Sequence, residues 1–250
     1  MAYPDGPAPA LPDRHGGALS VDDAKCADNC HACEPVCPTR ALSRADGKPV
    51  SLDLGRCLFC AACVDVCPHM AIVQTGDHRM AARKREDLIL GGETGKVRLA
   101  AALEKKMLKM FGRSLRLRQV SAGGCGACEA DTNVLGTIGW DLGRFGIQFV
   151  ASPRHADGIL VTGPVSKNME LALRKTYNAV ANPRIVIAVG ACAISGGPFA
   201  GIEQIDGGAN GVIPVDLFIP GCPPHPLTIL DGLLRLLDRL GENPSELTKA

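Results

Sequence analysis

The chain has 250 residues, 46% of them hydrophobic, so it can bury a core. Its formal net charge is +1 at pH 7, so the net charge does not indicate a particular class of partner. Twelve residues are cysteines, which could form a disulfide framework. The first 17 residues are polar and proline-rich, without the apolar core of a secretory signal, and disulfides do not persist in a reducing cytosol. We therefore favour metal ligation. The longest apolar run, residues 185–194, is too short to span a bilayer, so we expect a soluble or membrane-peripheral protein.

An internal repeat follows a proline-rich stretch, residues 1–19, that we interpret as a flexible tail. Cysteines thirty positions apart match: Cys30, Cys33 and Cys37 in the first copy, and Cys60, Cys63 and Cys67 in the second. One further cysteine precedes each copy, at Cys26 and Cys57. The second copy has the spacing C-x2-C-x2-C-x3-C-P, which is typical of bacterial ferredoxins. The first copy departs from this pattern, because three residues rather than two separate Cys26 from Cys30.

In the ferredoxin pattern, the last cysteine of each copy ligates the cluster of the other copy. We therefore predict two [4Fe–4S] clusters in a small α+β ferredoxin-like domain of residues 20–75. The predicted ligands are Cys26, Cys30, Cys33 and Cys67 for one cluster, and Cys57, Cys60, Cys63 and Cys37 for the other. The extra residue should bulge the first loop without changing the number of ligands, and it bears on that cluster's potential. A pair of zinc sites is the alternative, but zinc usually takes two separated pairs of ligands.

A basic connector occupies residues 76–112. Residues 79–118 contain twelve Lys or Arg and four acids, a net charge of +8. Apolar residues recur there at helical spacing and predict an amphipathic helix: Leu99, Leu103, Met107, Met110 and Phe111. Its charged face could simply be solvated, or it could dock on a partner or on an anionic membrane surface. Nucleic acid is not expected as a partner, because aromatic residues do not interleave the charges.

Strands and helices alternate over residues 113–242, ahead of a short tail at residues 243–250. The strand-like runs are residues 115–120, 145–150, 159–162, 185–189 and 215–219, and the helical runs are residues 129–135, 167–180 and 226–240. This alternation predicts an α/β domain with a parallel sheet covered by helices.

Four more cysteines follow strands of that predicted sheet. Cys125 and Cys128 come after the first strand, Cys192 after the fourth and Cys222 after the fifth. If these three strands are parallel neighbours, the four thiols meet at the carboxyl edge of the sheet, where open α/β sheets bind ligands. Four converging thiolates are the ligand set of a third [4Fe–4S] cluster.

Five blocks of the α/β domain resemble a known family. They are residues 125–129 (Cys-Gly-Ala-Cys-Glu), 152–157 (Ser-Pro-Arg-His-Ala-Asp), 163–165 (Gly-Pro-Val), 190–193 (Gly-Ala-Cys-Ala) and 220–224 (Pro-Gly-Cys-Pro-Pro). These blocks are similar to the small subunit of group 4 [NiFe]-hydrogenases, of which formate hydrogenlyase is an example. Most are shared by the homologous cluster-bearing subunit of respiratory complex I. The two residues between Cys125 and Cys128 match the hydrogenases, since the complex I subunits carry two adjacent cysteines there.

The resemblance implies a flavodoxin-like fold whose cluster is the proximal one and exchanges electrons with a large subunit that holds the active site. The N-terminal half resembles the separate ferredoxin-like subunit of the same complexes, so the chain looks like two subunits fused. The resemblance implies that the chain is an oxidoreductase subunit with three [4Fe–4S] clusters in a membrane-associated hydrogenase-type complex. It also implies that the chain lies peripherally on the cytoplasmic face of the cell membrane. The implied partners are the large subunit and membrane-embedded subunits, with a soluble electron carrier as a further candidate.

Two other functions compete with this interpretation. The chain could serve a complex I-like respiratory quinone oxidoreductase whose large subunit lacks nickel and iron. It could also be a zinc- or disulfide-stabilised scaffold without a redox role.

No combination of serine, histidine and carboxylate suggests that this chain itself holds a catalytic site. Glu129, next to Cys128, could relay protons toward the large subunit, or it could stabilise a helix N-terminus. His225, three residues beyond Cys222, could donate a hydrogen bond toward the cluster and raise its potential, or it could simply begin a helix. The sequence leaves both pairs of alternatives open.

Overall fold

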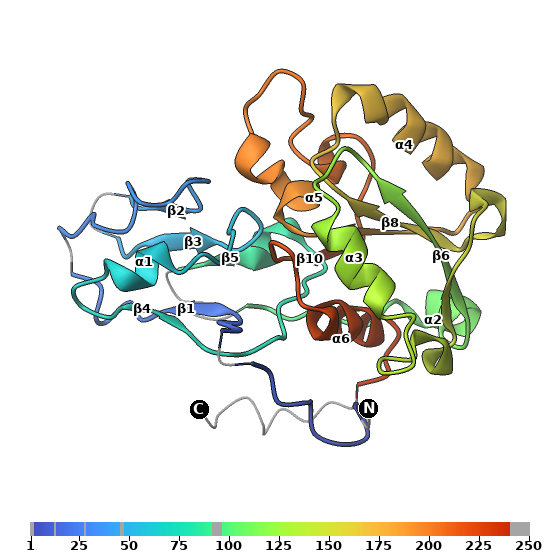
Figure 1. Ribbon diagram of the computed structural model, residues 1–250, viewed down its shortest axis with the longest axis horizontal. Helices are drawn as coiled ribbons and strands as arrows, with labels where there is room; N and C mark the ends of the chain where they lie inside the picture. The colour runs from blue at the N-terminus through green and yellow to red at the C-terminus, as the bar shows by residue number, and fades with distance from the viewer. Residues whose placement is uncertain (1–2, 13, 28, 46–47, 92–96, 241–250) are drawn as a thin grey trace.

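The computed structural model describes residues 3–12, 14–27, 29–45, 48–91 and 97–240. The larger sheet has five strands: β6 (Leu115–Ser121), β7 (Ile147–Phe149), β8 (Gly158–Thr162), β9 (Ile185–Val189) and β10 (Leu217–Ile219). All neighbouring strands pair in parallel, in the order β7-β6-β8-β9-β10 (Figure 1). Counted along the chain, this is the order 2-1-3-4-5 of flavodoxin-like folds. The predicted α/β fold class is therefore confirmed.

The two faces of the sheet are covered by different helices. One face packs against α2 (Lys105–Phe111), α3 (Ala127–Val134) and α6 (Pro226–Leu236), and the other against α4 (Lys167–Ala179) and α5 (Ala191–Ser195). Successive strand residues alternate between the two cores, because neighbouring side chains of a strand point to opposite faces. Leu217 belongs to the core beneath α6, and Phe218 to the core beneath α5.

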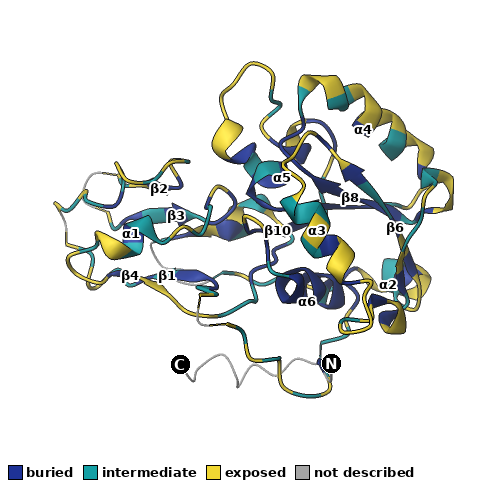
Figure 2. Ribbon diagram, in the orientation of Figure 1, coloured by how far each residue is buried: buried dark blue, intermediate teal, exposed yellow. Residues whose placement is uncertain are grey.

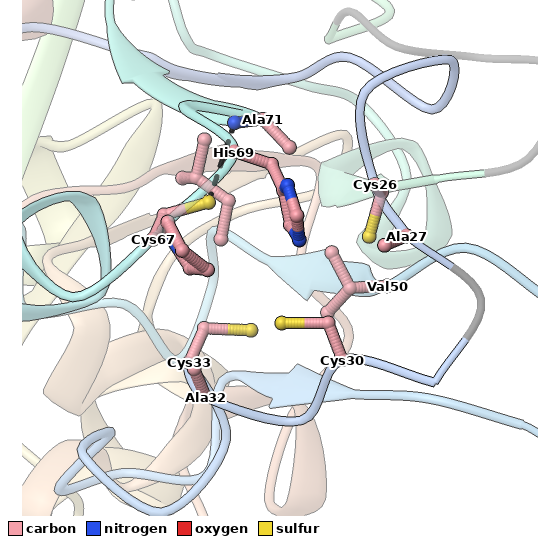
Figure 3. Close-up of a pocket in the computed structure, with 11 residues that line it drawn as sticks. Cys26, Ala27, Cys30, Ala32, Cys33, Val50, Cys67, His69 and Ala71 are labelled. Atoms are coloured by element: carbon pink, nitrogen blue, oxygen red, sulfur yellow. Dashed lines mark hydrogen bonds between the residues drawn. The ribbon is translucent and has the colours of Figure 1, made fainter.

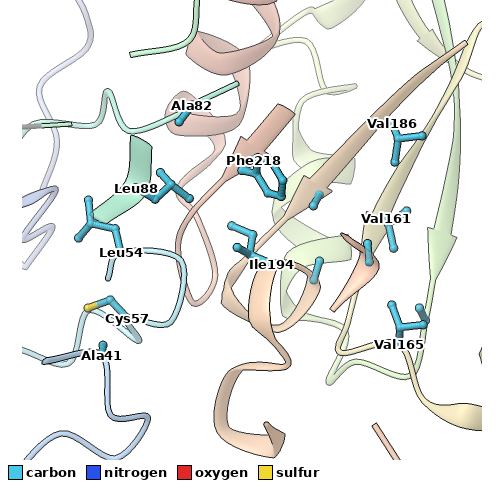
Figure 4. Packing of buried hydrophobic residues seen from close by; sticks show 14 of the residues in the cluster. Ala41, Leu54, Cys57, Ala82, Leu88, Val161, Val165, Val186, Ile194 and Phe218 are labelled. Carbon is cyan, nitrogen blue, oxygen red and sulfur yellow. The ribbon is translucent and has the colours of Figure 1, made fainter. Parts of the chain in front are cut away.

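The N-terminal part contains two small antiparallel sheets and one short helix. Its elements are β1 (Leu19–Val21), β2 (Leu42–Ser43), β3 (Ser51–Asp53), α1 (Ala62–Asp65), β4 (Ile72–Gln74) and β5 (Ile89–Leu90). β1 pairs with β4, and β3 lies between β2 and β5. Its core is continuous with the α5 face of the large sheet, where Leu54, Cys57 and Ile194 belong to one buried cluster (Figure 4).

Single-turn 3-10 helices complete the described structure. They are Arg85–Leu88, Leu142–Phe145, Pro153–His155, Gly197–Phe199 and Ala209–Gly211.

Within the segment predicted as a flexible tail over residues 1–19, the described residues Tyr3, Leu11 and His15 pack against the α/β domain. Helix α6 is buried nearly all round (Figure 2), so its outer side needs a cover. Tyr3 supplies part of that cover, and its hydroxyl donates a hydrogen bond to Asp231 Oδ1 at 2.9 Å. The predicted tail at residues 243–250 lies outside the described residues.

The connector also differs from the sequence prediction. Helix α2 begins at Lys105, so Leu99 and Leu103 lie in extended chain rather than on an amphipathic helix. Leu103 is buried and its backbone N–H donates to the Leu236 carbonyl oxygen, so packing against α6 outweighs the helical spacing. Upstream, the connector supplies β5 to the sheet of β2 and β3, so the N-terminal fold does not end at residue 75.

Candidate metal centres

None of the twelve cysteines forms a disulfide, which is at odds with a disulfide scaffold. They gather in three groups of four, which we name the first, second and third groups. Among the described residues, no three His, Cys, Asp or Glu side chains converge where one metal ion could bind. In a four-iron cubane the four thiolates bind different irons, so they surround the cluster rather than a single ion.

The first group consists of Cys26, Cys30, Cys33 and Cys67. These four residues line one pocket, and their sulfur atoms face a shared space (Figure 3). The Cys67 sulfur accepts a hydrogen bond from the Ala71 backbone N–H at 3.3 Å. Burial opposes ionisation of this thiol, but the surrounding backbone N–H groups outweigh it and hold the pKa of Cys67 below its ordinary value.

The second group consists of Cys37, Cys57, Cys60 and Cys63, which line one pocket. The Cys37 sulfur accepts from the Ala41 N–H at 3.2 Å, thirty positions before the matching pair of Cys67 and Ala71. Burial raises the pKa of Cys57 to about 12. The crossed arrangement predicted from the repeat therefore brings the expected cysteines together in space.

The third group consists of Cys125, Cys128, Cys192 and Cys222, at the carboxyl edge of the large sheet. Cys125 follows β6, Cys192 lies in α5 after β9, and Cys222 follows β10. β8 stands between β6 and β9, so the three cysteine-bearing strands are not all direct neighbours as we expected. Burial, with a smaller contribution from Cys192, raises the pKa of Cys128 to about 12, so these thiols lie within electrostatic reach of one another.

Two glycines keep space open around the third group. Gly190 has a φ of +90°, and a Cβ atom there would lie 2.6 Å from the Cys128 sulfur. Gly197 has a φ of +56°, and its Cβ would lie 2.8 Å from the Cys192 sulfur. Both backbone conformations favour glycine, and both positions exclude any larger residue beside a thiol.

The donor sets fit iron–sulfur clusters. Each group offers four thiols, and the sulfurs of the first and second groups also accept backbone N–H hydrogen bonds. Thiolate ligands with N–H donors at the sulfur atoms are the usual environment of such clusters.

A direct contact joins the segments that lie next to the second and third groups. Ser195, three residues after Cys192, has its Oγ 2.9 Å from the carbonyl oxygen of Gly55, two residues before Cys57, and 3.0 Å from the Ala191 carbonyl oxygen, so its one hydroxyl proton is shared between these two acceptors. A Cβ on Gly55 would lie less than 3.0 Å from the Ile194 side chain and the Arg85 guanidinium, so a larger residue would require these side chains to move. Arg85 is itself held by Asp53 at 2.5 Å.

Glu129 lies in the first turn of α3, with its carboxylate turned to two hydroxyl groups. Ser121 Oγ and Thr162 Oγ1 each donate to Glu129 Oε1 at 2.6 Å. Partial burial opposes ionisation, but these two donors outweigh it and hold the pKa of Glu129 below its ordinary value. A lowered pKa keeps the carboxylate charged, and its predicted role as a proton relay stays a prediction.

His225 begins α6 and caps it. Its Nδ1 accepts a hydrogen bond from the Leu227 N–H at 3.1 Å, which is the helix-start role. Its ring also packs edge-on against His15 and Trp140. The alternative role, a hydrogen bond toward the third group, stays a prediction.

Sequence reasoning missed the residues around the cysteines. Arg44 donates from Nη2 to the Cys26 sulfur at 3.1 Å. A residue-by-residue comparison of the two repeat copies would have found it, because its counterpart thirty positions later is Gln74. Ser195 and Gly55 carry no such signal, since their contact depends on how the two parts of the chain pack.

Comparisons with known proteins match both parts of the chain. The family model for the NADH ubiquinone oxidoreductase 20 Kd subunit matches residues 125–236, and that for the 4Fe-4S dicluster domain matches residues 25–72. The probable membrane-bound hydrogenase subunit mbhJ of Pyrococcus furiosus is 40% identical over 152 residues, covering 58% of this chain and 91% of that protein. Formate hydrogenlyase subunit 7 of Escherichia coli is 39% identical over 140 residues, covering 56% of this chain and 55% of that protein.

Two further similarities cover different shares of the chains compared. An NADH-quinone oxidoreductase subunit of Desulfovibrio desulfuricans is 44% identical over 113 residues, covering 45% of this chain and 61% of that protein. A solved chain of the membrane-bound sulfane sulfur reductase, an archaeal respiratory membrane complex, is 32% identical with a TM-score of 0.48, covering 56% of this chain and 78% of that one. The chain thus spans between half and two thirds of formate hydrogenlyase subunit 7 and of the Desulfovibrio protein.

Within the described part of the chain, no helix combines the length and apolar character needed to cross a membrane. The matched domain, its sheet order and its similarity to the hydrogenase and oxidoreductase subunits lead to one assignment. The chain is an iron–sulfur oxidoreductase subunit that belongs to the superfamily of group 4 [NiFe]-hydrogenase small subunits and the 20 Kd subunit of NADH ubiquinone oxidoreductase, with a 4Fe–4S dicluster domain ahead of the family domain.

Proposed function

We propose that this chain is the electron-transfer subunit of a membrane-associated group 4 [NiFe]-hydrogenase-type complex. The first, second and third groups of cysteines would each hold one [4Fe–4S] cluster. Such clusters, when bound, accept and release single electrons. The hydrogenase names of two relatives support this type of complex. The proposed partners are a large subunit with the active site and membrane-embedded subunits, with a soluble carrier as a further candidate, and the proposed location is the cytoplasmic face of the cell membrane.

The observation that carries the proposal is the contact between the segments that lie next to the second and third groups. A hydrogen bond from Ser195 to Gly55 joins the end of α5, the helix that carries Cys192, to the segment before Cys57. The apolar residues Leu54 and Ile194 pack beside it and exclude water. A subunit that passes electrons between two domains needs such a rigid, dry junction, whereas a scaffold does not need its cysteine groups joined in this way.

The chain also bears on the type of large subunit. Two residues separate Cys125 from Cys128, which favours the hydrogenase type over a complex I-like oxidoreductase without nickel and iron. The sequence of the neighbouring large subunit decides between them. Two C-x-x-C pairs there would support the hydrogenase type, and their absence would support the other.

A pair of cysteine variants tests the direction of the relay. We expect Cys222→Ser to stop electron exchange with the large subunit while dithionite still reduces the clusters of the first and second groups. We expect Cys60→Ser to block exchange with an external carrier while the cluster of the third group still equilibrates with the active site. If the Cys222→Ser complex delivers electrons to the large subunit at the normal rate, the third group is not the terminal relay.

A further inference from the structure

The two copies of the repeat differ at the loop that begins each cysteine group. Three residues separate Cys26 from Cys30, whereas two separate Cys57 from Cys60. Arg44 lies against the longer loop. Its Nη1 donates to the carbonyl oxygens of Ala27 and Cys30, both at 2.7 Å, and its Nη2 donates to the Cys26 sulfur at 3.1 Å. Residue 28, within the same loop, lies outside the described residues.

The Arg44 side chain is held in place from its other end. Its Nε donates to the Lys48 carbonyl oxygen at 2.7 Å, and its backbone N–H donates to Glu34 Oε1 at 3.0 Å. Arg44 follows β2 directly, so its backbone is fixed by the sheet. A planar guanidinium anchored at several nitrogens loses little further freedom on contacting a thiolate.

The second copy has no charged group in the matching place. Its counterpart of Arg44 is Gln74, an exposed residue at the end of β4 whose amide lies against Gly16. The leading cysteine there, Cys57, accepts instead from the neutral Phe59 backbone N–H at 3.3 Å. The first group therefore has a charged donor at its leading sulfur, and the second group has a neutral one.

We propose that Arg44 raises the reduction potential of the cluster held by the first group, while its guanidinium clamps the longer loop that carries Cys26. This inference rests on the proposed function. Reduction adds one electron to the cluster, breaks no bond and takes no proton from Arg44, because guanidinium stays protonated in proteins. The added negative charge is stabilised by a cationic hydrogen-bond donor at a ligating sulfur, which makes reduction more favourable.

The test is a redox titration of the holoprotein with dithionite, followed by electron paramagnetic resonance, in which Cys30→Ser identifies the signal of the first group. Removing the charged donor with Arg44→Gln, which copies the residue of the second repeat, should weaken electron binding by this cluster roughly tenfold. For a one-electron couple this is a midpoint lower by about 59 mV. Arg44→Lys keeps the charge without the fork, so its midpoint should fall by less. Lys48→Gln removes a positive charge four residues beyond Arg44. The Lys48 side chain does not contact a sulfur atom, so the midpoint of the first group's cluster should stay unchanged.

Two results would overturn the inference. One is an Arg44→Gln protein with full iron content and a wild-type midpoint for the first group. The other is an equal midpoint shift in Lys48→Gln, which would show that any nearby positive charge has this effect and that the hydrogen bond to the sulfur is not needed. If Arg44→Gln loses iron from this site, Arg44→Lys carries the test, and a wild-type midpoint in that variant counts against the inference. A wild-type protein that takes up no iron at all would instead refute the proposed function.

Discussion

Replacing Gly190 with alanine should remove the cluster of the third group by moving one thiol. A Cβ at this position would lie 2.6 Å from the Cys128 sulfur, at a φ of +90°. The optimal separation of non-bonded heavy atoms is about 3.5–4.0 Å, so the Cys128 sulfur must move by about 1 Å or more. The backbone conformation adds about 1–3 kcal/mol of strain, because φ +90° with ψ 156° is a region that residues other than glycine rarely adopt.

Gly201 provides a control that also has a positive φ but lacks the steric clash. Its φ is +87°, and a Cβ there meets nothing within 4 Å. Urea unfolding should show a loss of about 1–3 kcal/mol for Gly201→Ala, and a larger loss for Gly190→Ala, because that variant also displaces the Cys128 sulfur and loses the cluster. Iron analysis should show a loss of about four iron atoms per chain for Gly190→Ala alone. Full iron content and an unchanged spectrum in Gly190→Ala would show that Cys128 does not ligate a cluster.

Three further predictions concern the packing around the cysteine groups. Ser195→Ala removes the hydrogen bond to Gly55, so stopped-flow reduction should show slower electron transfer between the second and third groups at unchanged iron content; an unchanged rate would contradict the junction. Tyr3→Phe removes a donor to the buried Asp231 carboxylate and should cost about 1.5–3 kcal/mol in urea unfolding, whereas no loss would mean that the N-terminal segment does not stabilise α6. A fragment of residues 14–91 should reconstitute two clusters better than one of residues 20–75, because only the longer one contains β5; equal yields would contradict this.

The sequence predicted the sheet and the grouping of the cysteines because both follow local rules. The run at residues 185–189 coincides with β9, since five consecutive buried β-branched or small residues are typical of a central parallel strand. The ferredoxin pattern of the repeat paired Cys67 with the first copy and Cys37 with the second. The expected helix at residues 226–240 ends earlier, as α6 stops at Leu236.

What the sequence could not predict depends on contacts between distant segments. β5 pairs with β3, which lies more than thirty residues earlier in the chain. Leu103 lies outside a helix, and its backbone N–H donates a hydrogen bond to the Leu236 carbonyl oxygen. The Arg44 clamp needs the residue after β2 to lie against Cys26, Ala27 and Cys30, which come 14 to 18 positions earlier. No periodicity or spacing carries information about such approaches.

The central claim is that twelve cysteines hold three four-iron clusters. The most direct test is the iron, acid-labile sulfide and zinc content of the anaerobically purified full-length chain, measured together with its visible spectrum. We predict about twelve iron and twelve sulfide per chain, and a broad visible absorption that bleaches on reduction. Stoichiometric zinc with little iron would contradict the claim, and about eight iron with all cysteines intact would show that one of the three groups does not hold a cubane.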